Sequence, residues 1–179
     1  MAVNLSRWDM CDTCLSDTIA ELLAQYRVPS HLLRVEVTER VVMSGAERTL
    51  QALLHLSVLG IPIAIDDDGT DSSSLSYLKH LPSDELKIAR TFVQQMRTDR
   101  ADQAIVQSTV NMAHSLDLRV VAERVEDQAT GSVLSTFGCD TVQGYYLSRP
   151  VPVQEVERWF DERNDVVSIL STFKHLSRH

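Results

Sequence analysis

The sequence predicts an α/β protein, a partial (β/α) barrel of the TIM type with about six parallel strands, outer helices and an extra C-terminal helix. Short apolar runs rich in Val and Ile alternate with amphipathic stretches of helix length. The runs show little polar alternation, which is typical of parallel strands buried on both faces. Three runs, 34–39, 63–68 and 120–126, each stop at carboxylates, and they carry Glu36, Asp66 and Glu123. Acidic side chains at successive strand ends indicate a site on one face of such a barrel.

Composition excludes several classes of protein. The chain has 179 residues, of which 44% are hydrophobic and 23% charged, enough for one domain with a real core. A net charge of −8 argues against a nucleic-acid backbone binder. No apolar run approaches the roughly 18 residues of a membrane span. The N-terminus lacks the apolar stretch of a secretory signal, so we expect a cytoplasmic protein.

Three cysteines, an odd number, argue against a disulfide framework. Cys11 and Cys14 form a C-x-x-C spacing without a second pair or a thioredoxin-like context. Free cysteines mostly behave as small hydrophobic residues, so we expect these two to be buried and inert.

Each strand is justified by a short Val- and Ile-rich run, and each helix by apolar residues that recur every three or four positions. The predicted strands are 2–5, 33–38, 62–66, 85–88, 119–123 and 141–145. The predicted helices are 12–26, 46–59, 101–116, 127–137 and 153–163, with a further short helix between 66 and 85. Gly60 and Gly138 follow two of these helices, as glycine commonly does.

A closed barrel of this type has eight strands and about 250 residues, so the chain is predicted to lack the beginning of the barrel. We expect a barrel domain over 1–163 and an amphipathic helix over 164–179 that packs on the domain or on a partner. An open parallel sheet exposes its edges and apolar side chains. A homodimer or a complex with a protein partner is therefore expected.

Side chains that can bind metal or move protons lie near the ends of the predicted strands. They are Asn4, Glu36, the pair Asp66 and Asp67, Lys87 and Glu123. The C-terminal ends of parallel strands meet at one mouth, so these groups are expected to converge. Hard divalent cations prefer carboxylate and amide oxygens. Two metal ions can orient a water for an in-line displacement at phosphorus, and a nearby lysine can polarise that water.

Six segments stand in one order along the chain. They are Val3-Asn4-Leu5-Ser6, Glu36-Val37-Thr38-Glu39, Asp66-Asp67 with Gly69-Thr70, Leu86-Lys87-Ile88, Ala122-Glu123 with Val125-Glu126, and Val142-Gln143-Gly144-Tyr145. This series resembles the EAL-domain family of cyclic di-GMP phosphodiesterases, from about residue 2 to residue 160. The resemblance implies a modified TIM barrel that opens cyclic di-GMP to the linear dinucleotide pGpG, with Mg²⁺ or Mn²⁺ as cofactor.

The resemblance also implies roles for individual residues. Those that match family metal ligands or acids of the metal site are Asn4, Glu36, Asp66, Asp67 and Glu123. Lys87 matches the lysine near the attacking water, so Lys87 and Glu123 are the candidate catalytic residues. Glu39 matches a glutamate that steadies the loop after the aspartate pair, and Glu126 and Gln143 match polar residues of the substrate pocket.

Several positions depart from the family pattern. The Glu-Ala-Leu motif and the arginine after it would precede Met1. In the loop after the aspartate pair, Asp68, Asp71 and Ser72 stand where the family usually has Phe, Gly and Tyr. Ala89 replaces an aspartate, and Arg124 replaces a glycine between two glutamates.

Alternative interpretations remain open at this stage. The favoured one is a degenerate, non-catalytic EAL module that binds cyclic di-GMP or a protein partner, with or without a metal. The second is an active metal-dependent cyclic di-GMP phosphodiesterase, and a weaker third is a decayed product without activity. In a purely structural interpretation, the run Asp66–Asp68 is an acidic turn, and Lys87 is only a counter-ion for these aspartates. The sequence leaves open whether the short N-terminus is native and what covers the open barrel.

Overall fold

The computed structural model describes residues 1–44, 46–66, 78–156 and 158–159. The chain forms two compact units, Met1–Leu147 and Ser148–His179. The first unit holds the sheet and the candidate site, and in the second, residues 153–156 and 158–159 are helical. The predicted boundary at 163/164 and the predicted tail helix lie outside the described residues. No helix in the described part is both long and apolar enough to cross a membrane.

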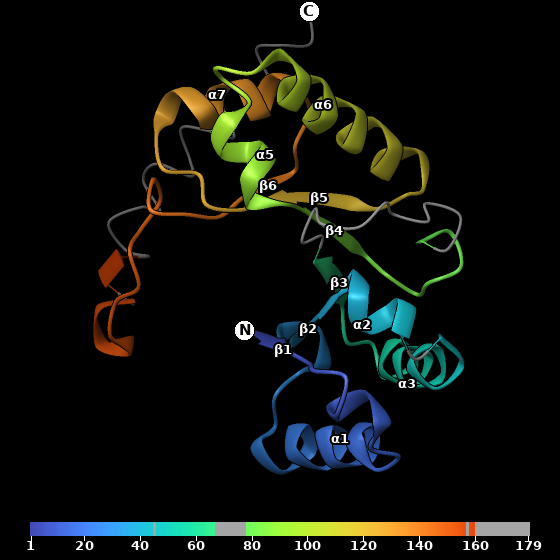
Figure 1. The fold of residues 1–179 in the computed structure, drawn as a ribbon. Coiled ribbons are helices and arrows are strands. Elements are labelled where there is room, and N and C mark those ends of the chain that lie inside the picture. The colour runs from blue at the N-terminus through green and yellow to red at the C-terminus, as the bar shows by residue number, and fades with distance from the viewer. Residues whose placement is uncertain (45, 67–77, 157, 160–179) are drawn as a thin grey trace, which may run out of the picture. The chain divides into compact units, whose positions relative to one another are not determined.

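The first unit is built on a six-stranded sheet in which every neighbouring pair is parallel, with the strands in sequence order (Figure 1). The strands are β1 (Ala2–Asn4), β2 (Arg34–Thr38), β3 (Ile63–Asp66), β4 (Glu85–Ile88), β5 (Arg119–Ala122) and β6 (Thr141–Val142). Successive parallel strands joined by helices are the arrangement of a partial TIM-type barrel, so the predicted fold class is confirmed. The sixth strand is shorter than predicted because the chain turns at Gly144.

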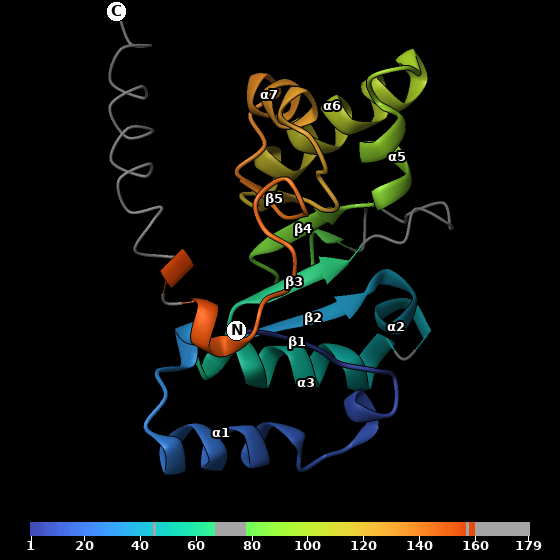
Figure 2. The same cartoon turned by 90° about the vertical axis from the view of Figure 1, so that its left-hand side faces the viewer.

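Helices cover the sheet along its length. They are α1 (Leu15–Tyr26), α2 (Glu39–Ser44), α3 (Ala46–Val58), α5 (Arg90–Gln95), α6 (Arg100–Ser115) and α7 (Gln128–Thr136), with 3₁₀ turns η1 (Asp9–Cys11) and η2 (Ser30–Leu32). In Figure 2, α2 and α3 lie beside β1 to β3 with α1 next to α3, and α5 to α7 lie beside β4 and β5. The long helices match the predicted ones closely, whereas α2, α5 and both 3₁₀ turns were not predicted. The predicted short helix between 66 and 85 lies mostly outside the described residues.

The sheet has one apolar and one charged face because alternate residues of a strand point to opposite sides. Val35 and Val37 stand in register with Ile63 and Ile65 and are buried in the core. Leu53 and Leu56 of α3, together with Val106, Val110 and Ala113 of α6, are fully buried in the same core. The prediction of strands buried on both faces is confirmed for β4, where all four residues are buried, and for the middle of β2, although every second residue of both strands is polar or charged.

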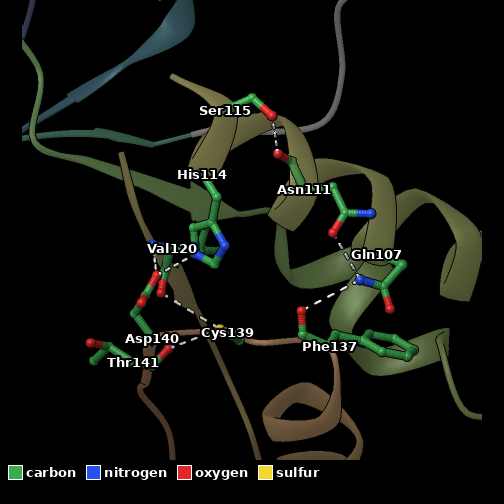
Figure 3. Close-up of polar contacts among 9 residues, drawn as sticks. All are labelled: Gln107, Asn111, His114, Ser115, Val120, Phe137, Cys139, Asp140 and Thr141. Carbon is green, nitrogen blue, oxygen red and sulfur yellow. Dashed lines mark hydrogen bonds and ion pairs between the residues drawn. The ribbon is translucent and has the colours of Figure 1, made fainter. Parts of the chain in front are cut away.

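A polar network joins the C-terminal end of α6 to β5 and β6 (Figure 3). The carboxylate of Asp140 accepts a hydrogen bond from the backbone N–H of Val120 at 2.8 Å and lies 2.9 Å from Nε2 of His114. The thiol of Cys139 donates to the carbonyl oxygens of Thr141 at 3.3 Å and Val120 at 3.5 Å. These contacts fix the chain at the entrance to β6.

The prediction of buried thiols at Cys11 and Cys14 was wrong, because both side chains are exposed. Cys11 ends the turn η1, which buries Met10 rather than the cysteines. Cys14 directly precedes α1, which starts three residues later than predicted. The half-buried cysteine is Cys139.

Candidate functional site

A polar pocket of about 430 Å³ lies at the C-terminal ends of the strands. Its lining residues come from the ends of β1 to β5 and from the loops after β5 and β6. They are Asn4, Glu36, Asp66, Lys87, Glu123, Arg124, Glu126, Gln143, Gly144 and Tyr145. The pocket therefore gathers groups that are distant in the sequence, as the parallel order of the strands predicts.

Lys87 is the centre of the pocket's electrostatics. Its ammonium lies 2.7 Å from Oε2 of Glu36 and also forms an ion pair with Oε1 of Glu123. Lys87 and Glu36 are buried and Glu123 is half-buried, with exposed side-chain fractions of 4%, 11% and 21%. Burial alone would lower the pKa of Lys87, but the hydrogen bonds and charges of Glu123 and Glu36 outweigh it, so the pKa is raised.

Strand register explains why Lys87 reaches Glu36. Neighbouring strands lie about 4.8 Å apart, so β2 and β4 are separated by about 10 Å, with β3 between them. The residue of β3 in register with Glu36 is Ala64, whose small, fully buried side chain leaves space for the lysine to cross. A larger residue at this position would block the ion pair.

A second charged cluster lies on the same face, at the N-terminal ends of the strands. The carboxylate of Glu85 lies 2.9 Å from the guanidinium of Arg34 and also pairs with Arg119. Glu85 is 2% exposed, and its Oε2 has no hydrogen-bond partner among the described residues. The face thus carries an Arg–Glu–Arg cluster at the N-terminal ends of the strands, here called the lower cluster. A Glu–Lys–Glu cluster lies at their C-terminal ends. Sequence analysis missed the lower cluster, although charged residues two apart in β2 and β4 indicate it.

The predicted site residues differ in how they meet the pocket. Asn4 stands in register with Glu36, and Asp66 with Lys87, so both flank the buried ion pairs. Glu126 lines the pocket and accepts a hydrogen bond from Gln94 at 3.4 Å. Gln143 also lines it.

Of the two remaining predicted residues, one is not part of this lining and the other is not described. Glu39 begins α2 and is not among the residues that line the pocket. Asp67 lies outside the described residues. The sequence analysis also did not assign the lining positions of Gly144 and Tyr145 to the site, although both belong to a segment that carries the family resemblance.

The loops after β5 and β6 are joined by backbone hydrogen bonds. The N–H of Gln143 donates to Ala122 at 2.8 Å, the N–H of Val125 donates to Gln143 at 3.0 Å, and the N–H of Tyr146 donates to Val125 at 3.0 Å. Gly144 packs so closely that a Cβ there would lie 2.2 Å from the carbonyl oxygen of Val125. This position therefore requires glycine for steric reasons.

The described side chains do not by themselves fit a divalent metal ion. Their oxygens are of the type that Mg²⁺ or Mn²⁺ prefers. However, Lys87 already neutralises Glu36 and Glu123, and an ammonium between two carboxylates competes with a cation for the same oxygens. Within 1–44, 46–66, 78–156 and 158–159, no group of three or more His, Cys, Asp or Glu side chains is arranged to hold a metal.

Comparison with known proteins decides the family. The model of the EAL domain matches residues 1–150 of this chain. The chain belongs to the EAL domain family. It is 42% identical over 157 residues to the bifunctional diguanylate cyclase/cyclic di-GMP phosphodiesterase MucR of Pseudomonas aeruginosa, a match that covers 87% of this chain and 23% of MucR. It is 39% identical over 163 residues to the signaling protein YkoW of Bacillus subtilis, covering 91% of this chain and 20% of YkoW.

A solved EAL-family structure has the same fold. The structure of the PaMucR phosphodiesterase in complex with c-di-GMP matches with a TM-score of 0.81 and 41% identity, over 87% of this chain and 63% of that chain. The chain spans less than a quarter of the length of MucR and YkoW.

Proposed function

We propose that this chain acts in cyclic di-GMP signalling as an EAL-family module that binds cyclic di-GMP in the polar pocket without hydrolysing it. Support for the ligand comes from the family and from the relative solved as a c-di-GMP complex. Support for binding without turnover comes from one observation: Lys87 forms ion pairs with both Glu36 and Glu123.

The ion pairs of Lys87 disfavour hydrolysis because they neutralise the charges of Glu36 and Glu123 and keep the lysine protonated. In the family resemblance, Glu36 and Glu123 belong to the metal site and Lys87 lies near the attacking water. A lysine held between two carboxylates has a raised pKa and stays charged, so it cannot accept a proton from water. The same lysine lowers the charge that the two acids can offer to a cation.

The pocket has the size and the polar groups that a bound nucleotide needs. Its volume of about 430 Å³ falls within the range of about 300–1,000 Å³ typical of ligand sites. Tyr145 lines the pocket and carries an aromatic ring of the kind on which bases stack. Gln143, Asn4 and Glu126 offer donors and acceptors for the edge of a base or for a ribose.

A second candidate function is metal-dependent hydrolysis of cyclic di-GMP to pGpG. It is favoured by the similarity to MucR, a bifunctional diguanylate cyclase/cyclic di-GMP phosphodiesterase, and by the convergence of Asn4, Glu36 and Asp66 on one pocket. In this case Mg²⁺ or Mn²⁺ would have to displace Lys87 from the two glutamates. The two functions therefore differ in their response to metal.

Calorimetric titration with cyclic di-GMP separates the two functions. We expect equal binding in EDTA and in Mn²⁺, with no linear dinucleotide released during incubation with Mg²⁺ or Mn²⁺. We expect Gln143→Ala to weaken binding, whereas the control Gln128→Ala, at the start of α7 and outside the pocket, should leave binding unchanged. Metal-dependent turnover that Asp66→Ala abolishes would establish the second function, and absence of binding in every condition would exclude the proposal.

We also propose a homodimer or a protein partner. Among the described residues, β1 and β6 each pair with one neighbouring strand only, so each leaves one edge open. An open strand edge exposes unpaired backbone groups to association. Sedimentation of the chain at several concentrations measures its self-association.

A further inference from the structure

Arg124 has a backbone conformation that glycine usually occupies. Its φ is +52°, in the left-handed region, where non-glycine residues are uncommon. The residue follows Glu123 between β5 and α7, its side chain is exposed, and it lines the polar pocket. Strained backbone tends to persist where the surrounding structure fixes it and where a side chain is used.

The surrounding structure does fix this residue. The next residue, Val125, is fully buried, and its N–H and carbonyl both bond to the loop after β6. Gly144 packs flat against the same stretch, because a Cβ on it would lie 2.9 Å from the carbonyl carbon of Arg124. The backbone of Arg124 is therefore held at the pocket, and only its side chain is free to rearrange.

Arg124 is the cation of the described lining that has no ion-pair partner among the described residues. Among the described residues, the lining carries four carboxylates, those of Glu36, Asp66, Glu123 and Glu126, and two cations, Lys87 and Arg124. Lys87 is committed to two of the carboxylates. Arg124 has no ion-pair partner among the described residues, which leaves its guanidinium available to an anionic ligand.

We infer that Arg124 binds a phosphate group of the ligand in this pocket and supplies the positive charge that a divalent metal would otherwise provide. This inference rests on the proposed function, because it names the contact by which a cyclic dinucleotide is held. A guanidinium suits the role, since it stays charged and can donate two parallel hydrogen bonds to a phosphate. Without this cation, the described lining would carry a formal charge of −3 rather than −2 and would repel a dianionic ligand more strongly.

The test compares two arginines that share a backbone conformation. Arg27 ends α1 with a φ of +53°, is exposed, and does not line the polar pocket. Arg124→Gly and Arg27→Gly therefore make the same chemical change and relieve the same backbone strain at two places. Because glycine adopts this conformation readily, both variants should melt at the same temperature as the parent chain or higher.

Cyclic di-GMP is titrated calorimetrically into each variant in EDTA. We expect Arg124→Gly to weaken binding about tenfold or more, the size of one lost charge-assisted contact. We expect Arg27→Gly to bind as the parent does. Arg124→Gln, which keeps a long side chain without the charge, should weaken binding as Arg124→Gly does, and in both variants affinity should depend less on salt.

The possible results separate this inference from the proposed function. If the parent binds and Arg124→Gly and Arg124→Gln bind equally well, the role of Arg124 is wrong and the proposed function stands. If Arg27→Gly weakens binding as much as Arg124→Gly, the effect is not a pocket contact and the inference is also wrong. If the parent does not bind cyclic di-GMP at all, both proposals fall.

Discussion

Lys87→Met removes the single buried cation between Glu36 and Glu123 while keeping a side chain of similar length. Two carboxylates with exposed fractions of 11% and 21% are then left facing each other without a counter-charge. Removing one partner of a buried ion pair costs about 3–5 kcal/mol. Because Glu123 keeps some contact with water, we expect about 3 kcal/mol at pH 7, a large fraction of a typical stability of about 5–15 kcal/mol.

In the parent chain, Lys87 should contribute equally to stability at pH 5 and at pH 7. In the parent chain, the raised pKa of Lys87 means that its stabilising effect is complete below the ordinary lysine value of about 10.4 and is lost only as the pH rises through the higher folded-state value. Lys87 therefore adds no pH dependence to the parent between pH 5 and pH 7.

Urea unfolding followed by circular dichroism measures the free energy of unfolding at both pH values. Lys79→Met is the matched control, because Lys79 is exposed. The triple variant Glu36→Gln, Lys87→Met, Glu123→Gln removes all three charges and should recover much of the loss. The reasoning is refuted if Lys87→Met costs no more than Lys79→Met, or if the triple variant recovers none of the loss.

Three further outcomes are expected. Gly144→Ala should lower stability by about 3 kcal/mol in urea unfolding, because its Cβ would lie 2.4 Å from the backbone nitrogen of Val125. Burial raises the pKa of Cys139, so at pH 8 this thiol should react with a disulfide reagent far more slowly than the two exposed thiols. Burial opposes ionisation of Asp140, but hydrogen bonds from His114 and Val120 keep its pKa low. This contribution is lost as the pH falls through that lowered value, so Asp140→Asn should reduce the acid sensitivity of the melting temperature.

The elements of the fold could largely be predicted from the chain. Buried runs such as Glu85–Ile88 and helices such as Ala46–Val58 depend on local apolar periodicity, which is visible in one sequence. The short helices α2 and α5 could not be predicted in this way, because each follows a strand closely and spans only six residues. Element ends also differ by a few residues, since the last turn of a helix depends on its tertiary contacts.

The candidate site was predicted as a set of residues but not as an arrangement. Strand-end position and the ordered motifs were enough to select Glu36, Lys87 and Glu123. Their mutual ion pairs depend on the small side chain of Ala64 and on the offset between β2 and β4, which only register determines. The left-handed conformation of Arg124 likewise follows from the packing of the loop after β6.

The sequence by itself determined the parallel order of the strands, the family and the residue types at the strand ends, because these follow from local pattern and motif order. Tertiary structure alone decided which charges meet. Strand register and loop packing bring Lys87 to both glutamates and leave Arg124 without an ion-pair partner among the described residues. Such pairings join residues distant in the chain through contacts of a few ångströms, and no local pattern encodes distances of that kind.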